Sequence, residues 1–438
     1  MGWGGYWAWD PVENASLLPW LTATALLHCF RMYKARSPVA VWTMVLSILT
    51  FSLCVFGRFL TKYGLVSSVH AFPDPGLGLL YMVLLVHVWV IAAVLIIRKY
   101  VGRKEVVEAG AAAHKYVIFN NWLFLALTFV IFIGTLFPFL TQVAIKIINA
   151  VSAKPSTMAP VTLEPSFFTK ITAPGGLFLL FLIGACPYLV RRGLNAGWRV
   201  VLGVICLIAA GALWLATCSL DTPRPQGFSG AMGWWVRWLL TGSPAIPYFI
   251  LCGYVLVNLI ADVVGKTAAR GLRWYGARLV HLGVAMMFVG IAGSGGYGVE
   301  KALAMKPGEK TTIKDFELTF DEFKGDHGPN YTAATAVISV SKNGKAIAQL
   351  RPAKAVYSPS GKSVSEIDIR RTLAGDLYLA VTDVNVSARM INLRIMVKPL
   401  INWIWIGSGL MTAGAMTVIV ALLKPAKRAA TEPAEAAP

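Results

Sequence analysis

The stretch LGLLYMVLLVHVWVIAAVLII occupies residues 77–97 and contains no Asp, Glu, Lys or Arg. About 20 apolar residues in helical conformation cross the hydrocarbon core of a bilayer, so this stretch predicts a transmembrane helix. The whole chain of 438 residues is 56% apolar and 14% charged, whereas ordinary soluble domains are about 25% charged. We therefore predict an all-α polytopic integral membrane protein rather than a set of soluble domains.

Further apolar stretches of similar length lie on both sides of this one, and each predicts another span. The prediction is about nine transmembrane helices, at residues 15–30, 40–57, 77–97, 118–140, 174–190, 199–217, 246–264, 278–295 and 401–423. Lys and Arg collect at alternate ends of these helices. The positive-inside rule places those ends in the cytoplasm, namely residues 31–36, 98–115, 191–199, 266–278 and 424–428.

The opposite ends are then extracytoplasmic, and they include residues 1–14, the loops near 58–76, 141–173 and 218–245, and the segment 296–400. This predicts a multi-pass plasma (inner) membrane protein. An external N-terminal segment normally follows an export signal or an earlier span, and neither precedes residue 1. We therefore expect an upstream part that is missing from this chain or encoded as a separate chain.

Segment 296–400 differs in kind, because apolar and polar residues alternate in runs such as 311–320 and 331–340. Asn343-Gly344 is a two-residue hairpin signal, so a small β-rich extracytoplasmic domain is predicted. The tail is rich in Ala, Pro and Glu. The predicted organisation is a Trp-rich segment at 1–14, an eight-helix membrane domain at 15–295, the β-rich domain at 296–400, a final transmembrane helix at 401–423 and a disordered cytoplasmic tail at 424–438.

The net charge of +19 does not indicate nucleic-acid binding. Most Lys and Arg flank apolar stretches or lie in segment 296–400, and no basic stripe is interleaved with stacking aromatic residues. The six cysteines form no CxxC pair, so neither a zinc site nor thioredoxin-like chemistry is indicated. The chain also lacks CxxCH and so carries no covalent c-type haem of its own.

Residues 3–20 read WGGYWAWDPVENASLLPW and are unusually rich in aromatic side chains. Asp10, Pro11 and Glu13 have the spacing of a capping box with proline at the first helical position, so a helix is predicted to begin at Pro11. The rings of Trp3, Trp7 and Trp9 would then lie just outside the membrane. They could form an ordinary interfacial aromatic belt, or a surface for a large flat ligand such as a porphyrin.

The sequence WGGYWAWDPVENASLLPWL resembles the WWD signature of haem-handling proteins, specifically the CcmF branch of cytochrome c maturation. The resemblance covers essentially the whole chain, although Lys62-Tyr63-Gly64 stands where the family more often has an Arg-Ser-Gly-like turn. It continues through Val69–Phe72, Gly134–Pro138, Val280–Gly283 and Arg394–Trp405. Family members normally carry several further spans before the signature.

His28 and His281 lie in different predicted spans, about one helical turn inside the same membrane face. Two imidazoles at matched depth can ligate one haem iron from opposite sides, and intramembrane ionisable groups are usually functional. Each could instead be a hydrogen-bonded structural residue. The family resemblance implies that these two positions hold a permanent b-type haem.

His70 lies in a proline-rich external loop at residues 67–75 and could be solvated or present a metal ligand. The resemblance implies that His70 is an external axial ligand of the haem being delivered, with the opposing histidine in the upstream part. His87 is interpreted as a helix-packing hydrogen bonder in its span. His114 and His327 are interpreted as solvated loop residues.

Several weaker candidates remain open. Asp10, Glu13 and Asn14 could be helix caps only, or could also contact haem propionates or an incoming partner. Asn258 and Asp262 could bond a cofactor edge or form a polar cluster at a helix end. The segment Val161–Phe168 resembles a family loop, and no role for it can be derived from the sequence.

The resemblance implies holocytochrome c synthesis, in which haem vinyl groups are joined to the thiols of a CxxCH peptide. Trp3, Trp7, Trp9, Asp10 and His70 are the candidate catalytic residues, and the His28/His281 haem is the expected electron relay from quinol. The implied partners are a haem chaperone, apocytochrome c with its thiol-handling subunit, and the upstream CcmF-like part. The alternatives are a haem-export or haem-handling protein without ligase activity and a cofactor-free solute transporter.

Overall fold

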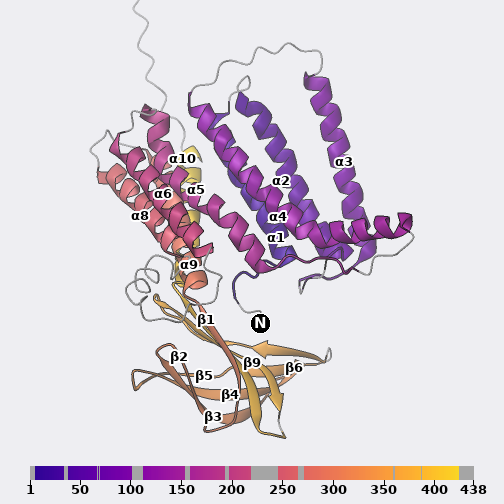
Figure 1. Ribbon diagram of the computed structural model, residues 1–438, viewed down its shortest axis with the longest axis vertical. Helices are drawn as coiled ribbons and strands as arrows, with labels where there is room; N and C mark the ends of the chain where they lie inside the picture. The colour runs from indigo at the N-terminus through magenta and orange to yellow at the C-terminus, as the bar shows by residue number, and fades with distance from the viewer. Residues whose placement is uncertain are drawn as a thin grey trace, which may run out of the picture. The chain divides into compact units, whose positions relative to one another are not determined.

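The computed structural model describes residues 5–33, 38–66, 68, 70–100, 112–152, 158–192, 197–218, 245–264, 271–358, 361–385 and 387–423. Within these residues the chain forms nine long helices and a β-sandwich (Figure 1). The helices are α1 (Pro11–Met32), α2 (Pro38–Tyr63), α3 (Pro75–Tyr100), α4 (Ala112–Val151), α5 (Pro165–Arg192), α6 (Trp198–Cys218), α8 (Ile246–Val264), α9 (Leu272–Gly296) and α10 (Asn402–Leu423).

The predicted fold class is confirmed, because each predicted span falls on one of these helices. Eight of the nine are long and apolar enough to cross a membrane. The exception is α1, whose sequence includes Glu13, Asn14 and several hydroxyl side chains. The ends of two helices were predicted wrongly: α4 continues to Val151 and α5 begins at Pro165, so much of the expected loop at 141–173 is helical.

Both differences involve proline. Pro174 lies inside α5, although the sequence prediction began the span there. Pro138 lies inside α4, whose 40 residues correspond to about 60 Å of helix, twice the thickness of a bilayer core. In Figure 1 the last part of α4 runs across the direction of the first part. A proline inside a helix removes a backbone hydrogen bond and bends the helix, so Pro138 accounts for this turn.

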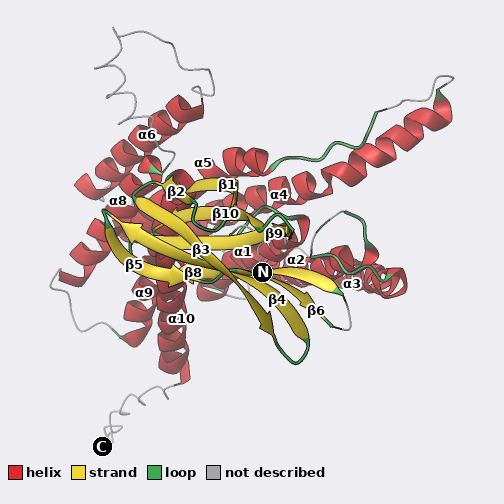
Figure 2. Ribbon diagram, turned by 90° about the horizontal axis from the view of Figure 1, so that it is seen from below, coloured by secondary structure: helices red, strands yellow, loops and turns green. Residues whose placement is uncertain are grey.

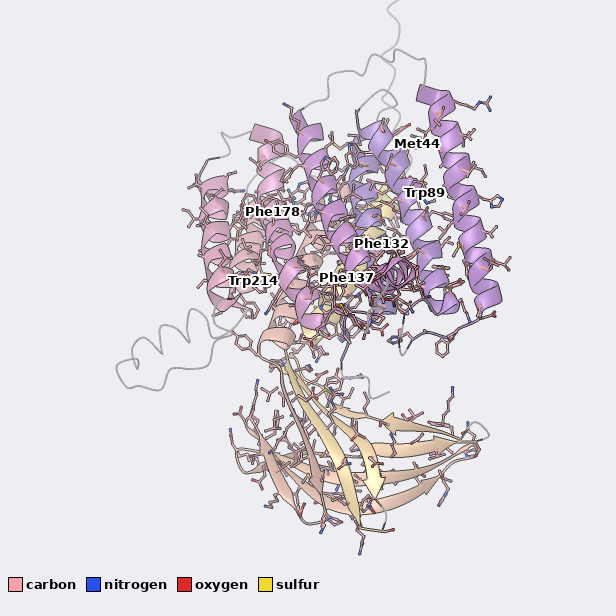
Figure 3. All side chains as sticks on the ribbon, turned by 45° about the vertical axis from the view of Figure 1, so that its right-hand side comes forward. Met44, Trp89, Phe132, Phe137, Phe178 and Trp214 are labelled. Atoms are coloured by element: carbon pink, nitrogen blue, oxygen red, sulfur yellow. The ribbon has the colours of Figure 1, made fainter. Side chains whose placement is uncertain are left out.

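The described residues divide into two compact units, Gly4–Val201 and Leu202 onward. In the first unit α1 packs against α2 and α4 through a core of buried apolar side chains: Leu18, Leu21, Ala25, Cys29, Val39, Leu46, Leu53, Phe124 and Ile131. α3 packs against α2 and leaves most of its side chains exposed, with Trp89 at 50% (Figure 3). The exposed apolar residues of α3 are those expected of a membrane-embedded helix.

In the second unit α9 and α10 pack at very short range along a seam of glycines spaced seven residues apart. A Cβ atom at Gly283 would lie 2.5 Å from the carbonyl oxygen of Gly407. A Cβ atom at Gly276 would lie 2.7 Å from the carbonyl oxygen of Gly414. Small residues let membrane helices approach closely, so the seam explains why this pair is tightly packed.

The β-sandwich between α9 and α10 consists of antiparallel strands in two sheets (Figure 2). One sheet has the order β1 (Val299–Met305), β10 (Met390–Pro399), β9 (Gly375–Asn385), β8 (Asp368–Arg370). The other has the order β2 (Lys310–Ile313), β3 (Phe316–His327), β4 (Tyr331–Lys342), β6 (Ala353–Tyr357), β7 (Lys362–Glu366), and β5 (Lys345–Leu350) pairs with β4.

The core of the sandwich follows the predicted alternation of apolar and polar residues. Leu318 and Phe320 of β3 and Leu377 and Leu379 of β9 are each at most 1% exposed. The predicted hairpin also forms, since Asn343 and Gly344 join β4 to β5 with φ values of 50° and 73°. Positive φ at both central residues is the conformation that Asn-Gly favours in two-residue hairpins.

Candidate functional site

The first turn of α1 is held by the predicted capping box. Asp10 Oδ1 accepts a hydrogen bond from Val12 N at 2.9 Å, and Glu13 Oε2 accepts one from Asp10 N at 3.3 Å. Glu13 Oε2 also accepts from Ala8 N at 2.7 Å, which ties the preceding segment to the helix. The two carboxylates therefore satisfy backbone N–H groups that the helix itself cannot.

Trp9 stands immediately before this cap in a left-handed backbone conformation, with φ of 57°. Its ring stacks on Phe168 with centroids 5.3 Å apart, and its Nε1 donates to Thr169 Oγ1 at 3.1 Å. The ring of Trp7 lies edge-on to Trp9, with centroids 5.7 Å apart and planes at 86°. The indole of Trp9 is therefore fixed by both stacking and a hydrogen bond, and Trp7 forms a corner with it.

The support behind Trp9 comes from α4 and α5. Phe168, near the start of α5, is 3% exposed. It lies so close to α4 that a Cβ atom at Gly134 would be 2.7 Å from its ring. Sequence reasoning did not assign Gly134, Phe168 or Thr169 to the site. The available signal was that 134–138 and 161–168 both resemble the family, but neither segment reveals its contact with Trp9 by itself.

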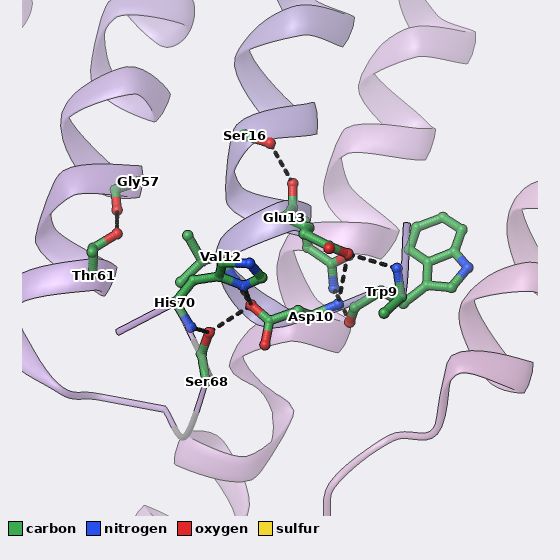
Figure 4. A network of polar contacts seen from close by, with 11 residues as sticks. Trp9, Asp10, Val12, Glu13, Ser16, Gly57, Thr61, Ser68 and His70 are labelled. Atoms are coloured by element: carbon green, nitrogen blue, oxygen red, sulfur yellow. Dashed lines mark hydrogen bonds and ion pairs between the residues drawn. The ribbon is translucent and has the colours of Figure 1, made fainter. Parts of the chain in front are cut away.

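Asp10 also joins the loop that carries His70 to the helix (Figure 4). Its Oδ1 accepts a hydrogen bond from Ser68 Oγ at 2.6 Å and lies 3.3 Å from His70 Nδ1. Ser68 Oγ accepts in turn from His70 N at 3.0 Å. The structure therefore brings together two of the predicted site residues, Asp10 and His70, which are 60 positions apart in the sequence.

Asn14 anchors the segment from inside the bundle. Its side chain is 1% exposed, and its Nδ2 donates to the carbonyl of Trp9 at 3.3 Å and to Thr135 Oγ1 on α4 at 3.1 Å. The amide nitrogen of Asn14 thus links the backbone turn at Trp9 to α4. Of the alternatives weighed for Asn14, these contacts favour a structural role.

The two predicted ligands of the resident haem lie in different units of the chain. On α1, His28 is half-buried, and its Nδ1 lies 2.8 Å from the carbonyl oxygen of Thr24. On α9, His281 lies three residues after Arg278. The pairing of His28 with His281 around one iron stays a prediction.

The other histidines differ in setting. His87 on α3 is exposed, and its Nδ1 contacts the carbonyl oxygen of Val83 on the same helix at 2.7 Å. The helix-packing role predicted for His87 is therefore wrong, because the side chain is exposed and its contact lies within its own helix. His327 is exposed at the end of β3. Trp3 and the side chain of His114 lie outside the described residues.

At one end of α8, Asp262 forms an ion pair with Arg278 of α9. The guanidinium of Arg278 also lies 5.1 Å from the ring centroid of Trp274, and Asn258 Nδ2 donates to the carbonyl of Tyr254 at 2.9 Å. These contacts favour a polar cluster at a helix end over contact with a cofactor edge. Over the described ranges there is no group of three or more His, Cys, Asp or Glu side chains that could hold a bare metal ion.

Comparison with known proteins gives two family matches. Residues 1–66 match the family described as cytochrome C assembly protein, and residues 296–399 match the family described as CcmF C-terminal beta-sandwich. The first match contains Trp7, Trp9 and Asp10. The second coincides with the observed sandwich.

Full-length relatives agree with these matches. The chain is 31% identical over 427 residues to the cytochrome c-type biogenesis protein CcmF of Pseudomonas aeruginosa, covering 94% of this chain and 60% of the relative. It is 30% identical over 449 residues to CcmF of Escherichia coli, covering 100% of this chain and 64% of the relative. The solved structure of "Cytochrome c Heme Lyase CcmF" has the same fold, with a TM-score of 0.69, 24% identity, and coverage of 97% of this chain and 61% of that one.

The chain thus spans about 60% of the length of the curated relatives that it matches. The aligned region contains the Trp9 turn with its cap, the His70 loop, the membrane helices and the sandwich. The chain is therefore homologous to CcmF over most of its length and belongs to the CcmF family of cytochrome c assembly proteins.

Proposed function

We propose that this chain is the part of a cytochrome c haem lyase that holds haem for attachment to the CxxCH thiols of apocytochrome c. The observation that carries the proposal is the meeting of an aromatic surface and an imidazole at one helix end. Trp9 is fixed by Phe168 and Thr169, and the next residue, Asp10, contacts His70. A flat apolar ligand with a metal at its centre needs both a ring surface and a nitrogen ligand.

The aromatic surface would position the substrate haem. Aromatic rings bury large apolar areas and prefer stacked or edge-to-face contacts, and Trp7 and Trp9 stand at right angles to each other. Because Phe168 and Thr169 of α5 already hold Trp9, the corner formed by Trp7 and Trp9 exists before any ligand binds. Preorganisation of this kind lowers the entropic cost of binding.

The reaction assigned to this site is addition of each cysteine S–H across a haem vinyl group, which forms one C–S bond and one C–H bond. The nucleophile belongs to the apocytochrome, so no side chain of this chain forms a covalent intermediate. The contribution of Trp7, Trp9 and His70 is to hold the vinyl groups beside the thiols, and correct positioning alone can lower a barrier by several kcal/mol, up to about 11.

The resident b-type haem belongs to the same proposal. His28 fits the role of a ligand, because its Nδ1 lies 2.8 Å from the Thr24 carbonyl and ligating histidines usually donate their second ring nitrogen to such an acceptor. His87 makes the same contact with Val83, so the contact permits ligation without identifying a ligand. A haem held by His28 and His281 would supply electrons, drawn from quinol, to keep the iron of the delivered haem reduced.

The partners and orientation follow from the same reasoning. The haem chaperone, the apocytochrome with its thiol-handling subunit and the upstream CcmF-like part would meet this chain at the Trp9 end of α1. The positive-inside rule puts that end and the sandwich on the extracytoplasmic side. The match of residues 296–399 to the CcmF sandwich favours the lyase over a haem-handling protein without ligase activity.

The test is formation of holocytochrome c in cells that express the chain with its upstream part and partners. We expect Trp7→Ala combined with Trp9→Ala to abolish haem-stained cytochrome c, because the corner that positions the porphyrin is lost. Trp20→Ala is the matched control, since Trp20 lies on α1 but is 45% exposed away from the site. Wild-type levels of holocytochrome c in the double variant would contradict the proposal.

A further inference from the structure

We propose that Asp10 is a positioning residue for His70, whose carboxylate holds the Nδ1 side of the imidazole so that Nε2 is the nitrogen offered to the metal of the incoming porphyrin. The inference rests on the proposed function, because it assumes that His70 is a ligand. It assigns to Asp10 a role beyond the helix cap predicted from the sequence.

Three groups surround one carboxylate oxygen of Asp10. Asp10 Oδ1 receives the Val12 N–H at 2.9 Å and the Ser68 hydroxyl at 2.6 Å, and it lies 3.3 Å from His70 Nδ1. The side chains of His70 and Asp10 are 24% and 13% exposed. The carboxylate is thus mostly shielded from solvent, where hydrogen bonds to a charged group are stronger than in water.

The contact with Asp10 also selects the tautomer of the His70 imidazole. An ionised carboxylate can only accept hydrogen bonds, so its contact with Nδ1 selects the form of His70 in which Nδ1 carries the proton. Nε2 then carries the lone pair that a metal requires. A carboxylate on the other ring nitrogen also increases the basicity of a ligating histidine and fixes its orientation.

The backbone of His70 is held by the same aspartate through Ser68. Ser68 Oγ accepts the N–H of His70 at 3.0 Å while it donates to Asp10. Asp10 therefore holds the ring of His70 directly and the main chain of His70 through Ser68 (Figure 4). Because Asp10 is fixed to the first turn of α1 by the Val12 bond, the imidazole is positioned relative to Trp9, which is the preceding residue.

Positioning of His70 and capping of the helix make different demands on residue 10. Ser, Asn and Asp cap helices about equally well, so the cap alone does not require an aspartate at position 10. Only Asp combines a cap with a negatively charged acceptor that reaches His70. Substitution by Ser or Asn should therefore preserve the helix start and remove the charged contact.

The experiment is a titration of the purified chain with zinc protoporphyrin IX, followed by the position of the Soret band and by fluorescence. Zinc porphyrins take a single axial ligand and do not change oxidation state, so neither an opposing histidine nor electron transfer is needed. The variants are Asp10→Asn, Asp10→Ser and Ser68→Ala. Asp74→Asn is the matched control, because it removes a negative charge from the loop that carries His70, at a carboxylate that accepts from Leu77 N at 3.2 Å.

We expect Asp10→Ser to weaken zinc porphyrin binding by about 10–100-fold, the usual cost of losing such a partner of a metal-ligating histidine. Asp10→Asn should fall between Asp10→Ser and the wild type, since its amide oxygen can still accept a hydrogen bond. Ser68→Ala should weaken binding without touching the helix cap. Asp74→Asn should bind as the wild type does, and the thermal unfolding midpoints of the Asp10 variants should stay close to that of the wild type.

The His70→Ala variant separates the ligand role of His70 from the positioning role of Asp10. If His70→Ala binds zinc porphyrin with the affinity and Soret position of the wild type, His70 is not a ligand and the proposed function fails at this residue. If His70→Ala loses the Soret shift while Asp10→Ser, Asp10→Asn and Ser68→Ala bind normally, the proposed function stands and the positioning role of Asp10 is overturned.

Discussion

At the residue scale, the indole of Trp9 is fixed by a single polar contact from α5. Trp9 Nε1 donates to Thr169 Oγ1 at 3.1 Å, and Thr169 Oγ1 donates to the carbonyl of Pro165 at 3.0 Å. The hydroxyl therefore links the tryptophan to the first turn of α5. Phe168 supplies the stacking contact beside it, so the orientation of Trp9 depends on two neighbouring residues.

Thr169→Val should reduce holocytochrome c formation by roughly five-fold, the equivalent of about 1 kcal/mol for one lost hydrogen bond. Valine has nearly the shape of threonine, so stacking on Phe168 is preserved while the indole N–H loses its acceptor. The matched control is Thr172→Val, which removes a hydroxyl bonded only to the Phe168 carbonyl of the same helix. Equal cytochrome c levels in the Thr169 variant and the wild type would show that this bond does not orient Trp9.

Sequence reasoning was most successful at this scale where the determinant is local. The capping box of Asp10 and Glu13 and the hairpin at Asn343-Gly344 each need only a few consecutive residues, and both were predicted. The contacts of Asp10 with Ser68 and His70 and of Trp9 with Phe168 join segments far apart in the sequence. No local pattern specifies such pairs, which is why the supporting residues were missed.

At the element scale, the closest helix contact is the glycine seam between α9 and α10. A Cβ atom added at Gly283 would lie 2.5 Å from the carbonyl oxygen of Gly407 and 2.7 Å from Cγ of Met411. Close backbone approach maximises van der Waals contact between helices that cannot gain a hydrophobic driving force from lipid. The seam therefore stabilises the pair of helices that flank the sandwich in the sequence.

Gly283→Ala should destabilise the protein by about 1–3 kcal/mol, because the added methyl group has no space and the helices must separate. The measurement is the thermal unfolding midpoint of the detergent-solubilised chain. Gly409→Ala is the control: this glycine of α10 has no atom within 4 Å of the added Cβ. It should leave stability unchanged or raise it by up to about 1 kcal/mol. Equal midpoints for both variants would exclude a tight seam.

The existence of the helices was predictable because long apolar stretches have few alternatives in a membrane. Their ends were less predictable. The predicted span at 174–190 began at Pro174 and the one at 118–140 ended two residues after Pro138, but both prolines lie inside helices. Proline is tolerated inside membrane helices because neighbouring groups can satisfy the freed backbone carbonyl. The positions of α4 and α5 matter for function, since the start of α5 carries Phe168 and Thr169.

At the scale of the whole molecule, one chain would perform two separate tasks. The Trp9 end of α1 would hold the substrate haem, and His28, near the other end of the same helix, would help to hold a resident haem. Both tasks share α1, which packs against α2 and α4 through a continuous apolar core. The variants Trp7→Ala and Trp9→Ala should accordingly leave the spectrum of the resident haem unchanged.

The pairing of His28 with His281 is predicted from their matched distance to the basic helix ends and stays a prediction. The two histidines belong to different units of the chain, with α1 in one and α9 in the other. A spectrum of each histidine variant tests whether both residues ligate the same haem. His87, which makes the same type of contact to its own helix as His28, provides the matched control.

The proposed haem ligation can be tested with the absorption spectra of the dithionite-reduced purified protein and its His28→Ala, His281→Ala and His87→Ala variants. The account predicts the Soret and α bands of a low-spin b-type haem in the wild type and in His87→Ala. Those bands should be lost from both His28→Ala and His281→Ala and should return when imidazole is added. Unchanged low-spin bands in both single variants would contradict the claim that this pair ligates a haem.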